Sequence, residues 1–285
     1  MKKIWLMVGI VCLAFFTKSD SVQIKNELTQ PKKIEEYYSK LQSPDLTDRY
    51  SAVYYLSQYP ERLNKKIINT VIDLFMMEIE RIKKFNKLLK QPGRIENKVP
   101  KELLYINSET YGLYWVDLCN IVGKSKEARV LPLLAEYHPD PRLLNDNFGE
   151  LAVDPVIHIL KTSDNSGRRA NQARVLGYLL EDKKEGYIAR GETRERIKKE
   201  LITCAVTDKE HTVRFSAATA LGKSGDSDVI PILEKIAQTD PYHFETKAAA
   251  GIDKDVAPGQ PVTRYPVRFA AQEALKKLRE GRKKG

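Results

Sequence analysis

The chain has 285 residues, with 48 Lys and Arg against 38 Asp and Glu, and a formal net charge of +10. This surplus is moderate and comes without a basic stripe interleaved with aromatic residues, so it does not indicate a nucleic-acid partner. Three cysteines and four histidines are present, and none has a Cys/His spacing that suits a metal ion. The length fits one elongated repeat array or two compact domains.

The N-terminus has the features of an export signal. Met1-Lys2-Lys3 is positive, and Ile4 to Phe16 is an uncharged, mostly apolar run. This run is too short to cross a bilayer as a helix but has the length of a signal-peptide core. We therefore predict a signal peptide over residues 1–21 and an exported, periplasmic or envelope-associated domain over residues 22–285. Cys12 leaves a second interpretation open, in which the protein is lipid-anchored or keeps its N-terminus as an anchor.

The first predicted unit, residues 40–89, combines a short helix with an unusually long one from about residue 63 to 89. Apolar residues at 3-4 spacing give the long helix one seam, which predicts burial against neighbouring helices, with dimerisation as the alternative. Tyrosines crowd this unit and suit either an end cap or an interface; they are Tyr37, Tyr38, Tyr50, Tyr54, Tyr55 and Tyr59. Prolines and glycine in residues 90–107 then predict an irregular insertion.

Two stretches that lie 99 residues apart share one plan. Gly123 is followed nine residues later by Pro132, and Gly222 is followed nine residues later by Pro231. In both, an apolar helix ends at a glycine that we expect to stop it, and a proline begins a second helix. This recurrence predicts stacked helical repeats, with the central ones over residues 108–239.

The clearest unit spans residues 212–239. Its segment Val213-Arg214-Phe215 recurs 54 residues later as Val267-Arg268-Phe269, in a last unit over residues 267–280. With the small residues and Leu-Gly pair that follow, this pattern resembles the HEAT repeat, in particular the short repeats of phycobilisome-lyase relatives. The resemblance implies an all-α fold, an α-solenoid of about six HEAT-like helix pairs. It also implies that Arg214 and Arg268 serve packing between repeats and do not bind a ligand.

Residues 240–266 separate the last two units and contain several prolines and glycines, which predicts an insertion loop. Insertions in solenoids often lie on the binding face. We expect a specific binding site here if the protein has one, and the alternative is a surface loop without a partner. The candidate side chains are Tyr242, His243, Phe244, Arg264 and Tyr265. The basic tail, residues 281–285, is either a solvated end or a contact to an anionic membrane surface.

No residue cluster points to catalysis, so we expect no catalytic residue, no metal and no cofactor. The histidines form no His-x-x-x-His or His-Glu pair, and Cys119 and Cys204 are expected to be free thiols in apolar helices. Aspartates recur near helix boundaries, where capping explains them better than paired acid-base chemistry; they are Asp140, Asp164, Asp208, Asp226 and Asp240.

The repeat fold and the leader together predict a non-catalytic scaffold of the bacterial cell envelope or periplasm that binds another protein or a peptide in its groove. One alternative is a membrane-attached lipoprotein accessory factor, with contact through the N-terminus or the basic tail. The other is an enzyme of a HEAT-like group, such as a bilin lyase or a DNA glycosylase. Both enzymes would work in the cytoplasm, and the leader argues against that. The sequence carries no indication of the oligomeric state.

Overall fold

The structure is a computed structural model that describes residues 31–93, 95–181, 186–249 and 257–282. The predicted signal peptide, residues 1–21, and most of the basic tail lie outside the described residues. In the part of the chain that the structure describes, no helix is both long enough and apolar enough to span a membrane.

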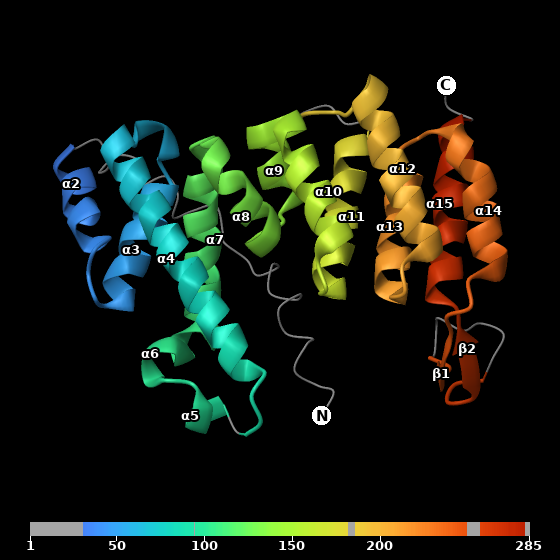
Figure 1. Ribbon diagram of the computed structural model, residues 1–285, viewed down its shortest axis with the longest axis horizontal. Helices are drawn as coiled ribbons and strands as arrows, with labels where there is room; N and C mark the ends of the chain where they lie inside the picture. Colours follow the sequence, from blue (N-terminus) through green and yellow to red (C-terminus); the bar gives the residue numbers. More distant parts are fainter. Residues whose placement is uncertain (1–30, 94, 182–185, 250–256, 283–285) are drawn as a thin grey trace.

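The helices stack in two layers along one long axis (Figure 1). The first layer consists of α3 (Leu46–Ser57), α7 (Glu109–Lys124), α9 (Pro141–Phe148), α11 (Ser166–Leu180), α13 (His211–Lys223) and α15 (Pro266–Arg282). The second layer consists of α4 (Lys65–Leu89), α8 (Leu131–Tyr137), α10 (Val153–Thr162), α12 (Gly191–Thr207) and α14 (Ile230–Thr239). This architecture is a mostly helical α-solenoid of stacked helix pairs, which confirms the predicted fold class. The six predicted units appear, over the described ranges, as five helix pairs and a sixth first-layer helix, α15.

Apolar stripes of the helices meet in one continuous core. In α13 Val213, Ala217, Ala220 and Leu221 form one apolar stripe at helical spacing, and all four are buried, with exposed fractions of 0 to 2%. The same core cluster extends from the first unit to Leu278 in α15. Burial of apolar area along the whole stack, and not local helix propensity, therefore supplies the main stabilisation of the array.

Glycines of the repeated Leu-Gly pairs lie inside the helices, which corrects the prediction that they stop them. Gly222 belongs to α13, and a Cβ atom built on it would lie 2.5 Å from the Cβ of Ala274 in α15. Gly177 in α11 approaches Ala220 in the same way, at 2.6 Å. The left-handed turn after α13 is formed instead by Gly225, with a φ of +73°. The repeated glycines thus allow first-layer helices to approach each other closely.

An additional helix, α2 (Pro31–Lys40), covers the N-terminal end of the array. Tyr37 of α2 stacks on Tyr55 of α3, with ring centroids 4.0 Å apart and planes at 14°. This contact fits the predicted capping role of the tyrosines. The long helix α4 has 25 residues and begins after Asn64, whose side chain accepts the backbone N–H of Ile67 at 3.0 Å.

Both predicted insertions occur where the chain passes from the second layer to the first. The other connections of this type have three residues each, 138–140, 163–165 and 208–210. Because all such connections lie at one edge of the layers, the insertions emerge from the same edge, and Figure 1 shows both projecting beyond it near opposite ends of the array. The first holds two short helices, α5 (Ile95–Lys98) and α6 (Lys101–Leu104), followed by a 3-10 turn.

The second insertion contains an antiparallel hairpin of β1 (Phe244–Lys247) and β2 (Pro261–Arg264). The prolines and glycines of this segment had predicted a loop. The strands have only four residues each, and their side chains are mostly exposed, so no apolar alternation marks them in the sequence.

Candidate protein-binding site

Asp240, the first residue after α14, holds the base of the hairpin against the array. Its carboxylate oxygens accept hydrogen bonds from Nε and Nη2 of Arg214 at 2.6 and 3.2 Å. The backbone carbonyl of Asp240 accepts from Nε of Arg268 at 2.7 Å, and the backbone N–H of Tyr242 donates to the Asp240 carboxylate at 3.0 Å. With its side chain 5% exposed, Asp240 forms a buried, charge-assisted clamp between α13 and α15.

The same arrangement occurs one repeat earlier. Arg169 donates from Nε and Nη2 to the two carboxylate oxygens of Asp208, both at 2.9 Å. Arg214 in turn donates from Nη1 to the backbone carbonyl of Asp208 at 2.9 Å. Each of these arginines therefore links helices of successive repeats, as the resemblance implied for Arg214 and Arg268.

These ion pairs correct part of the capping prediction for the aspartates. Asp140 does cap α9, because it accepts the backbone N–H of Leu143 at 2.8 Å. Asp208 and Asp240 pair with arginines as described, and Asp226 accepts from Nε of Arg194 at 2.9 Å. The sequence spacing of an aspartate at a helix boundary is the same for both roles, so it could not separate a cap from a clamp.

The predicted site residues form two aromatic contacts above this clamp. The ring of Tyr242 stacks on His211 with centroids 3.5 Å apart and planes at 6°, and the Phe244 ring lies 6.4 Å from Tyr242. His243 lies 5.5 Å from Tyr265 between ring centroids. Arg264 is opposite Phe244 in the hairpin register. The structure thus brings Tyr242 and Phe244 together and places His243 beside Tyr265.

Four residues of α13 and α15 near this insertion were not among the predicted site residues: His211, Phe215, Arg268 and Phe269. The guanidinium of Arg268 lies over the Tyr265 ring, 4.3 Å from its centroid. Phe215 lies one helical turn after His211 on α13, and Phe269 lies one turn after Tyr265 on the adjacent α15. The 54-residue recurrence of Val-Arg-Phe contained this signal, because it places both phenylalanines at the same helix position.

We name this surface the aromatic shelf. It consists of His211, Phe215, Tyr242, Phe244, Tyr265 and Phe269. The exposed fractions are 38% for Phe215, 45% for Phe244, 38% for Tyr265 and 60% for Phe269. Burial, and then the positive charge of Arg214, lowers the pKa of His211 below its usual value. The shelf is therefore a largely apolar, aromatic surface near pH 7.

A shallow cleft of about 250 Å³ lies on the second-layer side of the clamp. Its wall includes Val206 of α12, which is 43% exposed, and Lys235 and Thr239 of α14. Asp208, Arg214 and Asp240 also line it. Asp208 forms an ion pair with Arg169, and Arg214 forms one with Asp240. The cleft therefore combines apolar side chains with Lys235 and Thr239, and none of the three charged residues at its base is unpaired.

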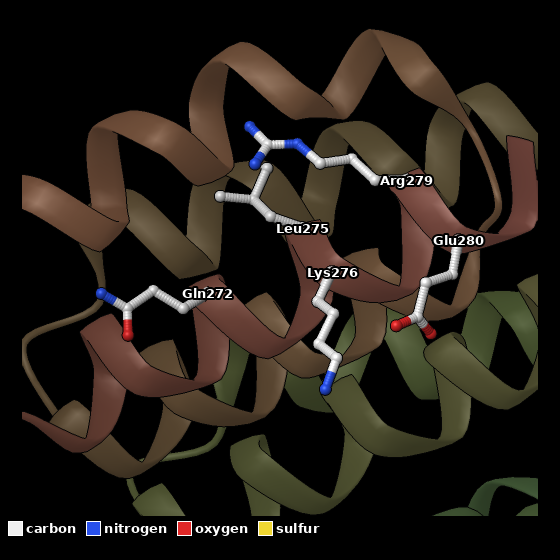
Figure 2. Close-up of a pocket in the computed structure, with 5 residues that line it drawn as sticks. All are labelled: Gln272, Leu275, Lys276, Arg279 and Glu280. Atoms are coloured by element: carbon white, nitrogen blue, oxygen red, sulfur yellow. The ribbon is translucent and has the colours of Figure 1, made fainter. Parts of the chain in front are cut away.

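A second hollow, of about 360 Å³, lies on the outward face of α15 (Figure 2). It is lined by Gln272, Leu275, Lys276, Arg279 and Glu280. In Figure 2 the side chains of Lys276 and Glu280 extend to one side of the helix and that of Arg279 to the other, where Arg279 donates to Glu234 of α14 at 2.8 Å. By the 54-residue offset Lys276 corresponds to Gly222, so a long charged side chain replaces the glycine of the helix contact.

A buried carboxylate lies at the other end of the array, and no sequence motif marks it. Glu78 of α4 has an exposed fraction of 0% and accepts a hydrogen bond from Arg81 at 2.6 Å. The hydroxyls of Tyr105, Tyr111 and Tyr114 donate to it at 3.3, 3.2 and 3.4 Å. Burial and then the charge of Glu78 raise the pKa of Tyr111, so the hydroxyl remains a donor. This network joins the first insertion to α4 and α7.

Comparison with known proteins identifies the repeat type in the centre of the chain. Residues 153–252 match a family model described as HEAT repeats. This region is HEAT-like. The HEAT match begins at α10, includes α11 to α14, and ends in the second insertion after β1. It carries no information on the phycobilisome-lyase subclass, which stays a prediction.

No curated protein matches the chain. Among solved structures, an engineered protein from a structural genomics consortium covers 87% of this chain and 98% of its own, at 17% identity and a TM-score of 0.34. A computationally designed armadillo repeat protein for modular peptide recognition covers 86% of this chain and 99% of its own, at 16% identity and a TM-score of 0.32. At these TM-scores the two structures say nothing further about this protein.

In the ranges that the structure describes, no group of three or more His, Cys, Asp or Glu side chains is arranged to hold a metal ion. Cys119 is a buried free thiol and Cys204 a partly buried one.

Proposed function

We propose that this solenoid is a non-catalytic protein-binding scaffold of the bacterial cell envelope, and that the aromatic shelf is its recognition surface. One observation carries the proposal: four large aromatic side chains of the shelf are each 38 to 60% exposed and lie on the hairpin and on the two helices that flank it, α13 and α15, which pack against each other. Exposed apolar area that is concentrated in one region marks interaction sites on soluble proteins.

The composition of the shelf supports a protein partner. Tyrosine and arginine are enriched among the residues that contribute most to binding at protein interfaces. Tyr265 with Arg268 over its ring supplies such a pair. The clamp at Asp240 fixes the hairpin base to two first-layer helices, so the shelf is preorganised and loses little entropy on binding. The expected partner is a protein segment that presents apolar or aromatic side chains.

The envelope location rests on the leader, a positive start followed by an apolar run of signal-peptide length. Intact-mass measurement of the protein recovered from the periplasm and from membranes tests it. Loss of about the first 21 residues supports cleaved export, and a lipid adduct on Cys12 supports the lipoprotein alternative. Recovery of only the full-length chain from the cytoplasm would overturn the location.

Photo-crosslinking in living cells tests the recognition surface. A photoreactive residue is placed at Phe269 on the shelf, at Met76 on the second layer, and at Leu151 in a connection at the opposite edge; these side chains are 60, 44 and 65% exposed. The proposal requires a discrete adduct from position 269 that Phe215→Ser abolishes. Adducts from position 76 alone would move recognition to the second layer, and equal adducts from all three would contradict a specific surface.

A further inference from the structure

The outer edge of β1 is an unusual feature of the second insertion. β1 and β2 form a two-stranded sheet in the part of the chain that the structure describes, and all four side chains of β1 are exposed. In Figure 1 the hairpin projects beyond the edge of the helical array. A strand in this position presents backbone groups to which another extended chain can bind.

Hydrogen bonding within the hairpin determines which backbone groups point outward. The N–H of Ala248 donates to the carbonyl of Gln260 at 2.7 Å, and this pair continues the register of the two strands. Because hydrogen-bonded and non-hydrogen-bonded pairs alternate in an antiparallel ladder, the N–H and C=O groups of Glu245 and Lys247 point away from β2. Pro261, opposite Lys247, agrees with this alternation, because a residue at that position does not need a backbone N–H to donate to β1.

The two edges of the hairpin differ in what they offer. On β2 the outward position 261 is proline, which has no N–H and blunts that edge. On β1 both outward residues, Glu245 and Lys247, keep a donor and an acceptor. β1 is therefore the edge that can accept another strand.

The outward residues of β1 are complementary to themselves. When two β1 strands pair antiparallel about Thr246, Glu245 of each copy lies opposite Lys247 of the other, and the two Thr246 residues face each other. Opposite charges and Thr–Thr pairs in directly opposed positions stabilise antiparallel sheets. The neighbouring registers place Glu245 opposite Glu245, or Lys247 opposite Lys247, and like charges in that position are destabilising. Charge thus selects one register.

We propose that the protein self-associates through β1, so that two hairpins join in a four-stranded antiparallel sheet, β2–β1–β1–β2, around a two-fold axis. The interface is isologous, with the same edge contributed by each copy. A four-residue strand buries less area than the roughly 1,200 Å² of a standard stable interface, so the dimer dissociates on dilution. The inference goes beyond the proposed function, and binding of a partner by the shelf does not depend on it.

Self-association would place two aromatic shelves on one assembly, since each hairpin base carries one. A partner with two recognition segments then binds with an effective concentration set by the distance between the shelves. The dimer contact therefore has a functional consequence even when each shelf binds weakly.

Charge reversal tests the register directly. Glu245→Lys leaves two lysines on the edge and Lys247→Glu leaves two glutamates, so each variant repels itself. We expect each to weaken the dimer by at least about tenfold, because two favourable cross-strand pairs become unfavourable. The double variant Glu245→Lys/Lys247→Glu restores complementarity and the dimer, and an equimolar mixture of the two single variants forms the mixed dimer.

Sedimentation velocity of the purified proteins over a wide concentration range measures these equilibria, with thermal melting as the check on folding. Glu273→Lys on α15 changes the net charge as Glu245→Lys does and leaves the edge intact, so it must dimerise like the wild type. Hydrogen exchange at the amides of residues 245 and 247 must slow as the wild-type concentration rises. A wild type that stays monomeric throughout, or a dimer that both single reversals leave unchanged, overturns the proposal.

Discussion

Gly222 of α13 lies directly against Ala274 of α15, so closely that a Cβ atom on the glycine would lie 2.5 Å from the Cβ of the alanine. Gly177 and Ala220 repeat this relationship between α11 and α13. Close packing of α11 against α13, and of α13 against α15, therefore depends on a missing side chain at one position in each contact.

Gly222→Ala is expected to destabilise the protein, although alanine has the higher helix propensity. Overpacking in a close helix contact costs about 1–3 kcal/mol, because the two backbones must move apart. Gly112→Ala on α7 is the matched control, since nothing lies within 4 Å of a Cβ atom built there, and it should stabilise by about 0.5–1 kcal/mol. Urea denaturation of both variants measures the difference. Equal effects of the two changes would show that the helix contact is not tight.

Asp240→Asn is expected to lower the free energy of unfolding by about 3–5 kcal/mol, because it leaves the buried guanidinium of Arg214 without its counter-charge. The exposed pair of Arg279 and Glu234, with side chains 60% and 46% exposed, provides the control. Glu234→Gln should change stability by less than about 1 kcal/mol. Chemical denaturation compares the two, and a similar small loss for both would mean that the clamp is not a stabilising element.

The lowered pKa of His211 predicts that acid weakens the fold. The imidazole titrates at lower pH in the folded than in the unfolded chain, because burial and Arg214 disfavour its charged form. Stability from this residue is thus present above the unfolded pKa of about 6.5 and is lost as pH falls through the folded pKa. His211→Phe keeps an aromatic ring against Tyr242 and removes the titration.

Melting temperatures between pH 7.5 and 5 measure this effect. The slope with pH should be smaller in His211→Phe than in the wild type. Part of the slope should remain, because burial also lowers the pKa of His138. An unchanged slope would show that His211 titrates alike in the folded and unfolded chains.

Both thiols in the array should react slowly. Burial raises the pKa of Cys204 to about 11, so at pH 8 only about one thiol in a thousand is ionised there. Cys119 is fully buried, and burial raises its pKa well above the usual value. In a Cys12→Ser chain, a chromogenic disulfide reagent should modify Cys204 slowly and Cys119 more slowly, and both at once in denaturant. Rapid native labelling of Cys119 would contradict its burial.

The sequence predicts the layers well because the stripe of α13 and the recurring proline positions depend on local periodicity. It predicts the role of Gly222 wrongly. A glycine near a helix end is compatible both with ending the helix and with a close helix contact, and only the position of Ala274 in the fold distinguishes the two. In the network around Glu78, the three tyrosines lie 27 to 36 positions from the glutamate in the chain. No short sequence motif can indicate contacts over that separation.

The sequence predicts the candidate site within the second insertion, as four aromatic residues and Arg264, whereas half of the shelf lies on helices. His211, Phe215 and Phe269 belong to the repeats themselves, and their relation to Tyr242 and Tyr265 exists only after α13 and α15 stack. The hairpin was missed because a four-residue strand with exposed side chains has no apolar alternation.

Lys276 at the contact position of α15 has a consequence for how the array can grow. If a HEAT-like unit were duplicated and joined after α15, its first helix would pack against Lys276 and Gln272. The corresponding positions of α13 are the small residues Gly222 and Ala218. A polar end of this kind keeps a solenoid soluble. Extending this protein by gene duplication or by design therefore requires both positions to revert to small residues in the same step.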